Sequence, residues 1–134
     1  MAKLVEIEGI GEAYAAKLAE QGITTGEALL AAGRTAKGRE QLAEATGISR
    51  KLILEWVNLA DLFRIKGIGE EYSDLLEEAG VDTVAELAQR NPENLYRALV
   101  EANQVKKLVR RLPSQLQVAY WVEQAKELPR AVEY

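Results

Sequence analysis

Residues 7–25 read IEGIGEAYAAKLAEQGITT, and residues 65–83 read IKGIGEEYSDLLEEAGVDT. The second stretch repeats the first at an offset of 58 positions, which aligns Gly9 with Gly67. Each copy places two glycines around an isoleucine and continues with apolar residues at helical spacing. This turn and helix, written twice, decide the fold, because they predict that one structural unit occurs twice in the chain.

The repeat extends through the rest of both copies, with one insertion. ILEWVNLA in the first copy matches VAYWVEQA in the second at an offset of 65, which aligns Trp56 with Trp121. Both tryptophans lie on apolar helical faces, so we expect them to anchor the core. The larger offset means that the second copy carries about eight extra residues between Ala102 and Ser114, roughly two helical turns.

Local signals predict where the helices begin and end. Three stretches have the spacing of a capping box, in which side chains satisfy backbone groups at the start of a helix. They are Thr24-x-x-Glu27, Thr83-x-x-Glu86 and Ser114-x-x-Gln117. Asn91-Pro92 predicts a further helix start, and Gly22 and Gly80 stand where left-handed residues end helices.

The overall pattern predicts an all-α fold. Residues 49–63 should form a largely buried helix, because apolar side chains recur there at helical spacing and on its flanks. No segment alternates apolar and polar residues over the length of a strand. We expect a first repeat in residues 1–64 and a second in residues 65–134, which together form one compact, pseudo-symmetric helical unit.

The composition excludes several kinds of chemistry. The 134 residues contain no histidine and no cysteine, which removes the imidazole base, the thiolate nucleophile, the disulfide and the usual zinc ligands. We therefore expect no enzyme, no cofactor, no metal and no small-molecule substrate. No stretch approaches the roughly 18 uninterrupted apolar residues of a membrane span, and the opening segment lacks the apolar core of a signal peptide. We expect a cytoplasmic protein.

The net charge of −4 is unevenly distributed along the chain. Residues 1–31 carry −3, residues 32–66 carry +3, residues 67–101 carry −7 and residues 102–134 carry +3. Each copy is therefore acidic around its glycine turn and basic further on. This alternation is a second sign of the repeat.

The Gly-Ile-Gly turn suggests a binding site. Its glycines permit a turn too tight for a Cβ atom, and its isoleucine can fill the space between two helices. The backbone N–H groups that begin the next helix lack intrahelical partners, and together with the helix dipole they can hold an anion. The candidate contact residues of the two turns are Gly9, Ile10, Gly11, Gly67, Ile68 and Gly69.

With Gly9-Ile10-Gly11 followed by Ala15, and Gly67-Ile68-Gly69 followed by Ser73, the chain resembles the helix-hairpin-helix family. Two copies joined by a helix resemble the tandem domain of that family, which in many relatives grips the phosphates of duplex DNA without reading sequence. The layout is also similar to a bacterial family of domains of unknown function built from such hairpins. The resemblance implies two hairpins and a possible DNA partner.

Acidic residues beside the turns depart from the DNA-binding pattern. Relatives that bind DNA commonly carry Lys or Arg two positions after the second glycine, where this chain has Ala13 and Glu71. Glu12 and Glu70 also flank the turns. The donors at a helix end contribute only about 0.3–1 kcal/mol to anion binding, which neighbouring carboxylates can offset. We expect these carboxylates to occupy the positive end of the helix dipole themselves.

The insertion provides another candidate contact site. Apolar residues recur at helical spacing from Val105 to Leu112, which predicts a short amphipathic helix. Its opposite face carries four cations: Lys106, Lys107, Arg110 and Arg111. Such a face can bind phosphates, an acidic protein surface or anionic lipid, and it can also pair with the acidic region of this chain or of a neighbour. A basic face of this kind is equally typical of an ordinary solvated helix.

Two functions are consistent with these features. The first is a non-enzymatic module for binding or assembly, whose partner is a protein or a second copy of the chain. In this interpretation the helix after Ser114 packs against the first turn, in the same chain or in a neighbour. The alternative is sequence-independent binding to the backbone of duplex DNA, through the basic face and the amides of the turns.

Overall fold

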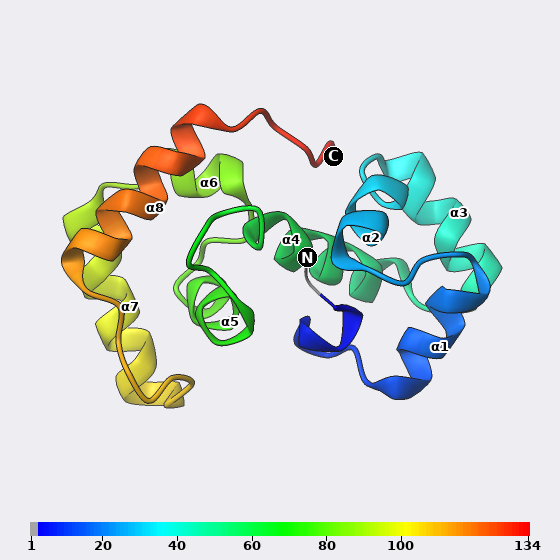
Figure 1. Ribbon diagram of the computed structural model, residues 1–134, viewed down its shortest axis with the longest axis horizontal. Helices are drawn as coiled ribbons and strands as arrows, with labels where there is room; N and C mark the ends of the chain where they lie inside the picture. The colour runs from blue at the N-terminus through cyan, green and yellow to red at the C-terminus, as the bar shows by residue number, and fades with distance from the viewer. Residues whose placement is uncertain (1–2) are drawn as a thin grey trace. The chain divides into compact units, whose positions relative to one another are not determined.

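The computed structural model describes residues 3–134, so Met1 and Ala2, with which the predicted first repeat begins, lie outside the described residues. The described chain is helical and contains no strand, apart from an isolated bridge between Lys3 and Thr25, which confirms the all-α prediction (Figure 1). In chain order the elements are η1 (Leu4–Glu6), α1 (Glu12–Glu20), α2 (Gly26–Ala32), α3 (Ala36–Thr46), α4 (Arg50–Leu62), α5 (Glu70–Glu78), α6 (Val84–Ala88), α7 (Pro92–Lys106) and α8 (Gln115–Glu127).

The chain divides into two compact units. The first extends to Asp61 and also includes Ala131–Tyr134, and the second is Leu62–Arg130. The last four residues therefore belong to the first unit, whereas the sequence assigned them to the second repeat. The reason is local packing, because Val132 is buried and the Glu133 N–H donates a hydrogen bond to the Arg34 carbonyl at 2.8 Å.

In the first unit, η1 packs beside α1, and α2 packs beside α3. Helix α4 contains the apolar run that the sequence predicted as a largely buried helix, and that prediction is confirmed. Five of its apolar side chains are buried in this unit: Ile53, Trp56, Val57, Leu59 and Ala60. The tryptophan is therefore a core anchor, as expected from its apolar face.

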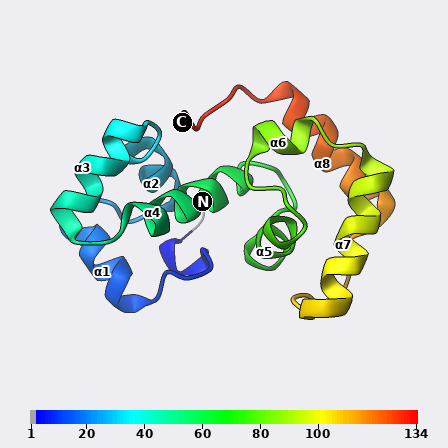
Figure 2. The same ribbon diagram turned by 180° about the vertical axis from the view of Figure 1, so that it is seen from behind.

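In the second unit, α8 packs against α6 and α7, and α5 packs against α7. Figure 1 and Figure 2 both show α8 running alongside α7. A single apolar core joins these helices. Its largest members include Trp121, Leu75, Leu76, Leu87 and Leu95.

Most predicted helix starts are confirmed. The side chains of Thr83, Asn91 and Ser114 each accept a hydrogen bond from the backbone N–H three residues later, and Ser114 forms a complete capping box. At α2 the prediction is wrong by one residue, because Thr25 is the cap and Thr24 is not. The Thr25 Oγ1 accepts a hydrogen bond from a backbone N–H of the first turn at 3.1 Å.

None of the helices within residues 3–134 is both long enough and apolar enough to span a membrane.

Candidate functional site

The first glycine turn rests on Trp56. Gly9 has a left-handed φ of 93°, and the turn is closed by the Ile10 N–H, which donates to the Ile7 carbonyl at 3.1 Å. A Cβ atom on Gly9 would lie only 3.0 Å from Trp56 Nε1. The ring of Tyr14 packs on the same indole, with the two centroids 5.0 Å apart. The indole of α4 thus supports both the turn and helix α1.

The second turn has the same construction around Trp121. Gly67 has a φ of 96°, and the Ile68 N–H donates to the Ile65 carbonyl at 3.2 Å. A Cβ atom on Gly67 would lie 3.0 Å from Trp121 Nε1. The ring centroids of Tyr72 and Trp121 are 5.3 Å apart. The two offsets seen in the sequence therefore pair equivalent glycines with equivalent tryptophans.

The helix after Ser114, for which we predicted packing against the first turn in the same chain or a neighbour, contacts the second turn within its own unit. Trp121 of this helix, α8, lies at Gly67 of the second turn. Trp56 of α4 occupies the equivalent place at Gly9. Each turn therefore contacts the tryptophan of the helix that ends its own repeat.

The six predicted turn residues divide into two groups. Ile10 and Ile68 are buried and belong to the core, whereas the four glycines are exposed. Gly11 and Gly69 are the N-cap residues of α1 and α5, and as glycines they offer no side chain to satisfy the first N–H groups of those helices. The turns therefore present backbone donors at the surface, beside the carboxylates of the first helical turns.

The prediction of a basic helix in the insertion is wrong. Helix α7 ends at Lys106, Lys107 takes a left-handed φ of 51°, and residues 108–113 form an irregular loop. The side chain of Asn103 explains why the helix ends early, because it both accepts a hydrogen bond from the backbone of Val109 and donates one to it. Its Oδ1 accepts from the Val109 N–H at 3.0 Å, and its Nδ2 donates to the Val109 carbonyl at 3.2 Å.

The four cations of the insertion extend from the last residue of α7 through the loop that follows it, and we call this segment the basic loop. Lys106, Lys107, Arg110 and Arg111 are all exposed. Within residues 3–134, none of their side chains takes part in a hydrogen bond or an ion pair. The phenol of Tyr72 donates a hydrogen bond to the Arg111 carbonyl at 3.0 Å. Because Tyr72 also packs on Trp121, this hydrogen bond joins the basic loop to the second turn.

Sequence reasoning missed an apolar strip on α8. Leu116 is 83% exposed and Tyr120 is 55% exposed, and they lie one helical turn apart. Leu116 also lines a hollow of about 380 Å³ between the beginnings of α7 and α8, together with Asn91, Pro92, Glu93, Gln115 and Ala119. The helical period could have revealed the strip, because its residues fall outside the buried face of α8.

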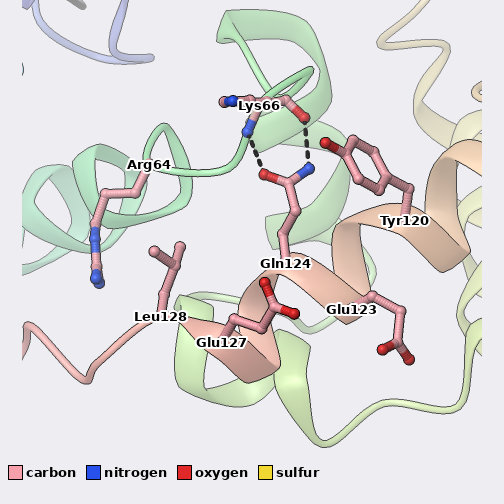
Figure 3. Close-up of a pocket in the computed structure, with 7 residues that line it drawn as sticks. All are labelled: Arg64, Lys66, Tyr120, Glu123, Gln124, Glu127 and Leu128. Atoms are coloured by element: carbon pink, nitrogen blue, oxygen red, sulfur yellow. Dashed lines mark hydrogen bonds between the residues drawn. The ribbon is translucent and has the colours of Figure 1, made fainter.

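A second hollow, of about 340 Å³, lies beside the second turn (Figure 3). The side-chain amide of Gln124 binds the backbone of Lys66 there. The Lys66 N–H donates to Gln124 Oε1 at 2.9 Å, and Gln124 Nε2 donates to the Lys66 carbonyl at 3.1 Å. The other lining residues are Arg64, Tyr120, Glu123, Glu127 and Leu128. Gln124 thus fixes the backbone immediately before Gly67.

Across residues 3–134, acidic side chains nowhere gather into a group of three or more that could hold a metal ion. A family model described as "Domain of unknown function (DUF4332)" matches residues 8–128. The matched region contains both glycine turns, both tryptophans and the basic loop. No curated protein matches the chain, and no solved structure matches it.

Proposed function

The chain belongs to the family described as Domain of unknown function (DUF4332), and from its residues we propose that it is a non-enzymatic module of two helix-hairpin-helix repeats that acts through protein–protein contacts. Two features support the assignment of hairpin repeats. Gly9 and Gly67 share a left-handed φ, and each lies against the indole of an equivalent tryptophan. The closing hydrogen bond of the turn also recurs in both units.

The apolar strip of α8 carries the proposal of a protein partner. Single exposed apolar residues are normal on protein surfaces. Here, however, Leu116 and Tyr120 lie one helical turn apart on α8, and Leu116 lines a hollow that another side chain can enter. Burying one large apolar side chain contributes about 1.5–3 kcal/mol, so a partner that covers both residues gains substantially. Glu93 at the rim of the hollow favours a partner with a basic or hydrogen-bonding group nearby.

The experiment compares three tagged forms of the full chain in extracts of its native source. The test variant carries Leu116→Glu and Tyr120→Glu, which places charge on the strip. The control carries Val105→Glu, the same kind of change at an apolar residue that is 78% exposed on α7. We expect the wild type and the control to retain a common set of proteins that the test variant loses. Retention of that set by all three forms would contradict a role for the strip.

Light scattering on the same three forms tests a second copy as the partner. We expect the apparent mass of the wild type and of Val105→Glu to rise with concentration if the strip binds another molecule of this chain. The double variant should then stay at the mass of a monomer. A mass that rises equally in all three forms would place self-association elsewhere.

The basic loop supports a second candidate function, binding to the backbone of duplex DNA. The hydrogen bond from Tyr72 to the Arg111 carbonyl, at 3.0 Å, joins the loop with its four exposed cations to α5, the helix that follows the second turn. The positive charge of this loop opposes that of Glu70 and Glu71, which repel a phosphate at the turn. In this function the loop and the turn amides bind phosphates together.

Fluorescence anisotropy with labelled duplex DNA tests this candidate. We expect the affinity to fall steeply with salt, by about 0.9 log units per tenfold increase for each phosphate contact. Reversing the charges of Lys106, Lys107, Arg110 and Arg111 should remove most of the binding. Reversing the charge of Lys126, which pairs with Glu123 on α8, is the control. Absence of binding by the wild type at low salt would exclude this function.

A further inference from the structure

The last four residues of the sequence, Ala131–Tyr134, dock into the first unit, although α8 before them belongs to the second. We call these residues the tail. The Glu133 N–H donates to the Arg34 carbonyl at 2.8 Å, and the Glu133 carboxylate lies 3.4 Å from Arg34 Nε. Val132 is only 2% exposed. The tail is therefore held through its backbone, through an apolar side chain and through a charge.

Arg39 provides the centre of the surface that receives the tail. Its side chain is buried, with the residue 6% exposed, and its guanidinium is satisfied by backbone carbonyls. Nη1 donates to the carbonyls of Gly33 at 2.8 Å and Arg34 at 3.2 Å, while Nη2 donates to the Glu133 carbonyl at 2.8 Å. In the described chain no carboxylate pairs with Arg39. Without the tail, Nη2 therefore loses the acceptor that the structure gives it.

Tyr134 completes the contact. Its hydroxyl donates to Asn58 Oδ1 at 3.0 Å, and its ring centroid lies 5.8 Å from the Arg39 guanidinium carbon. Asn58 is itself buried on α4. The receiving surface thus binds the backbone N–H and carbonyl of Glu133 and the hydroxyl of Tyr134, and the Val132 side chain is buried in the docked tail. Such a combination of backbone and side-chain contacts is how proteins recognise short peptides.

We propose that Arg34, Arg39 and Asn58 form a peptide-binding socket for a Val-x-Tyr segment, and that in an assembly its occupant is the tail of a second copy of this chain. The tail of the same molecule fills the socket in the isolated chain. Exchange between two copies preserves every contact named above, so it requires no new complementary surface. This socket shares no residue with the strip on α8, and the proposal stands whether or not that strip binds a partner.

The covalent connection between socket and tail sets the conditions for exchange. Because both belong to one chain, the molecule's own tail competes as an intramolecular ligand and outcompetes the tail of a neighbour in dilute solution. Exchange can be detected at low concentration when one molecule carries a tail that no longer binds and the other carries a socket that no longer binds a tail.

The experiment therefore mixes two full-length variants. The tail variant carries Val132→Asp and Tyr134→Ala and keeps the socket. The socket variant carries Arg34→Glu and Asn58→Ala and keeps the tail. Circular dichroism establishes that each variant is folded, and native mass spectrometry separates a heterodimer from either homodimer. We expect a 1:1 heterodimer at micromolar concentration in the mixture, in excess of any dimer that each variant forms alone.

A second measurement covers the case in which either of these variants fails to fold. It uses the full chain with the milder changes Glu133→Lys and Tyr134→Ala, and a labelled peptide with the sequence of residues 130–134. We expect this variant to bind the peptide at least tenfold more tightly than the wild type, whose own tail competes. A peptide with aspartate in place of the valine is the control and should not bind. Absence of both the heterodimer and peptide binding in folded proteins would overturn the proposal.

Discussion

Trp121 Nε1 lies 3.0 Å from the place that a Cβ atom on Gly67 would occupy, so the indole and the turn are in direct contact. Two further contacts continue from this one: Trp121 packs on Tyr72, and the Tyr72 hydroxyl donates a hydrogen bond to the Arg111 carbonyl. The glycine turn, the aromatic pair and the basic loop of the second unit are thereby connected. A substitution at Gly67 should therefore also affect the packing of Tyr72 on Trp121 and the position of the basic loop.

Replacing Gly67 by alanine should destabilise the protein by about 1–3 kcal/mol, because the new Cβ meets the indole and because an alanine is strained at a φ of 96°. Urea unfolding followed by tryptophan fluorescence measures this. Gly69→Ala is the matched control, since its φ is −117° and no atom lies within 4 Å of the added Cβ. Equal losses for the two variants would show that neither the contact with Trp121 nor the left-handed φ of Gly67 makes this position special.

The all-α fold, the tryptophan anchors and most helix starts could be predicted because each depends on residues close together in the sequence. The helical period exposes the apolar face of residues 49–63, and a cap such as Ser114 needs only a partner three residues away. The repeat aligned Gly9 with Gly67 and Trp56 with Trp121, but the contact between each glycine and its tryptophan emerged only from the structure, because the two residues are more than 40 positions apart.

The remaining errors arise where tertiary contacts override a local pattern. The spacing of apolar residues from Val105 to Leu112 fits a helix, but Asn103 binds the backbone of Val109 and ends the helix earlier. Val109 is then buried, while Val105 is left exposed on α7. The docking of Ala131–Tyr134 in the first unit joins residues that are far apart in the sequence, so no local sequence pattern could predict it.

Replacing Asn103 by alanine should release the basic loop, because both of its hydrogen bonds to the Val109 backbone disappear. We expect a loss of about 1–3 kcal/mol, since buried backbone groups would be left without partners. Hydrogen exchange provides the specific readout, with the Val109 amide losing its protection. Gln104→Ala, at an exposed neighbouring position of α7, should change neither quantity. Unchanged protection of Val109 in the Asn103 variant would contradict this account of the loop.

The cap of α2 distinguishes two adjacent threonines. Thr25→Ala should cost about 0.5–2 kcal/mol, because the Thr25 Oγ1 accepts a backbone N–H of the first turn at 3.1 Å. Thr24→Ala should be close to neutral, since Thr24 is exposed and does not cap the helix. The two midpoints of thermal unfolding, measured side by side, decide between them. A larger loss at Thr24 would place the cap where the sequence spacing alone had put it.

Gln124 offers a test of how the second turn is held. Its two hydrogen bonds to the Lys66 backbone, at 2.9 and 3.1 Å, should each contribute about 0.5–1.5 kcal/mol. At the offset of 65, the first copy has Leu59 in this position. Gln124→Leu therefore gives the second copy the side chain of the first, and we expect it to destabilise the protein by about 1–3 kcal/mol.

Hydrogen exchange identifies where the effect of Gln124→Leu arises. The Lys66 amide should lose protection in this variant, because its acceptor Oε1 is gone. Glu123→Gln is the control on the same helix, since it removes only an exposed ion pair with Lys126 at 3.4 Å, and such pairs contribute about 0–1 kcal/mol. If Gln124→Leu left both the unfolding free energy and the Lys66 amide unchanged, the turn would be held by Trp121 alone. The hollow of Figure 3 would then play no part in shaping the second turn.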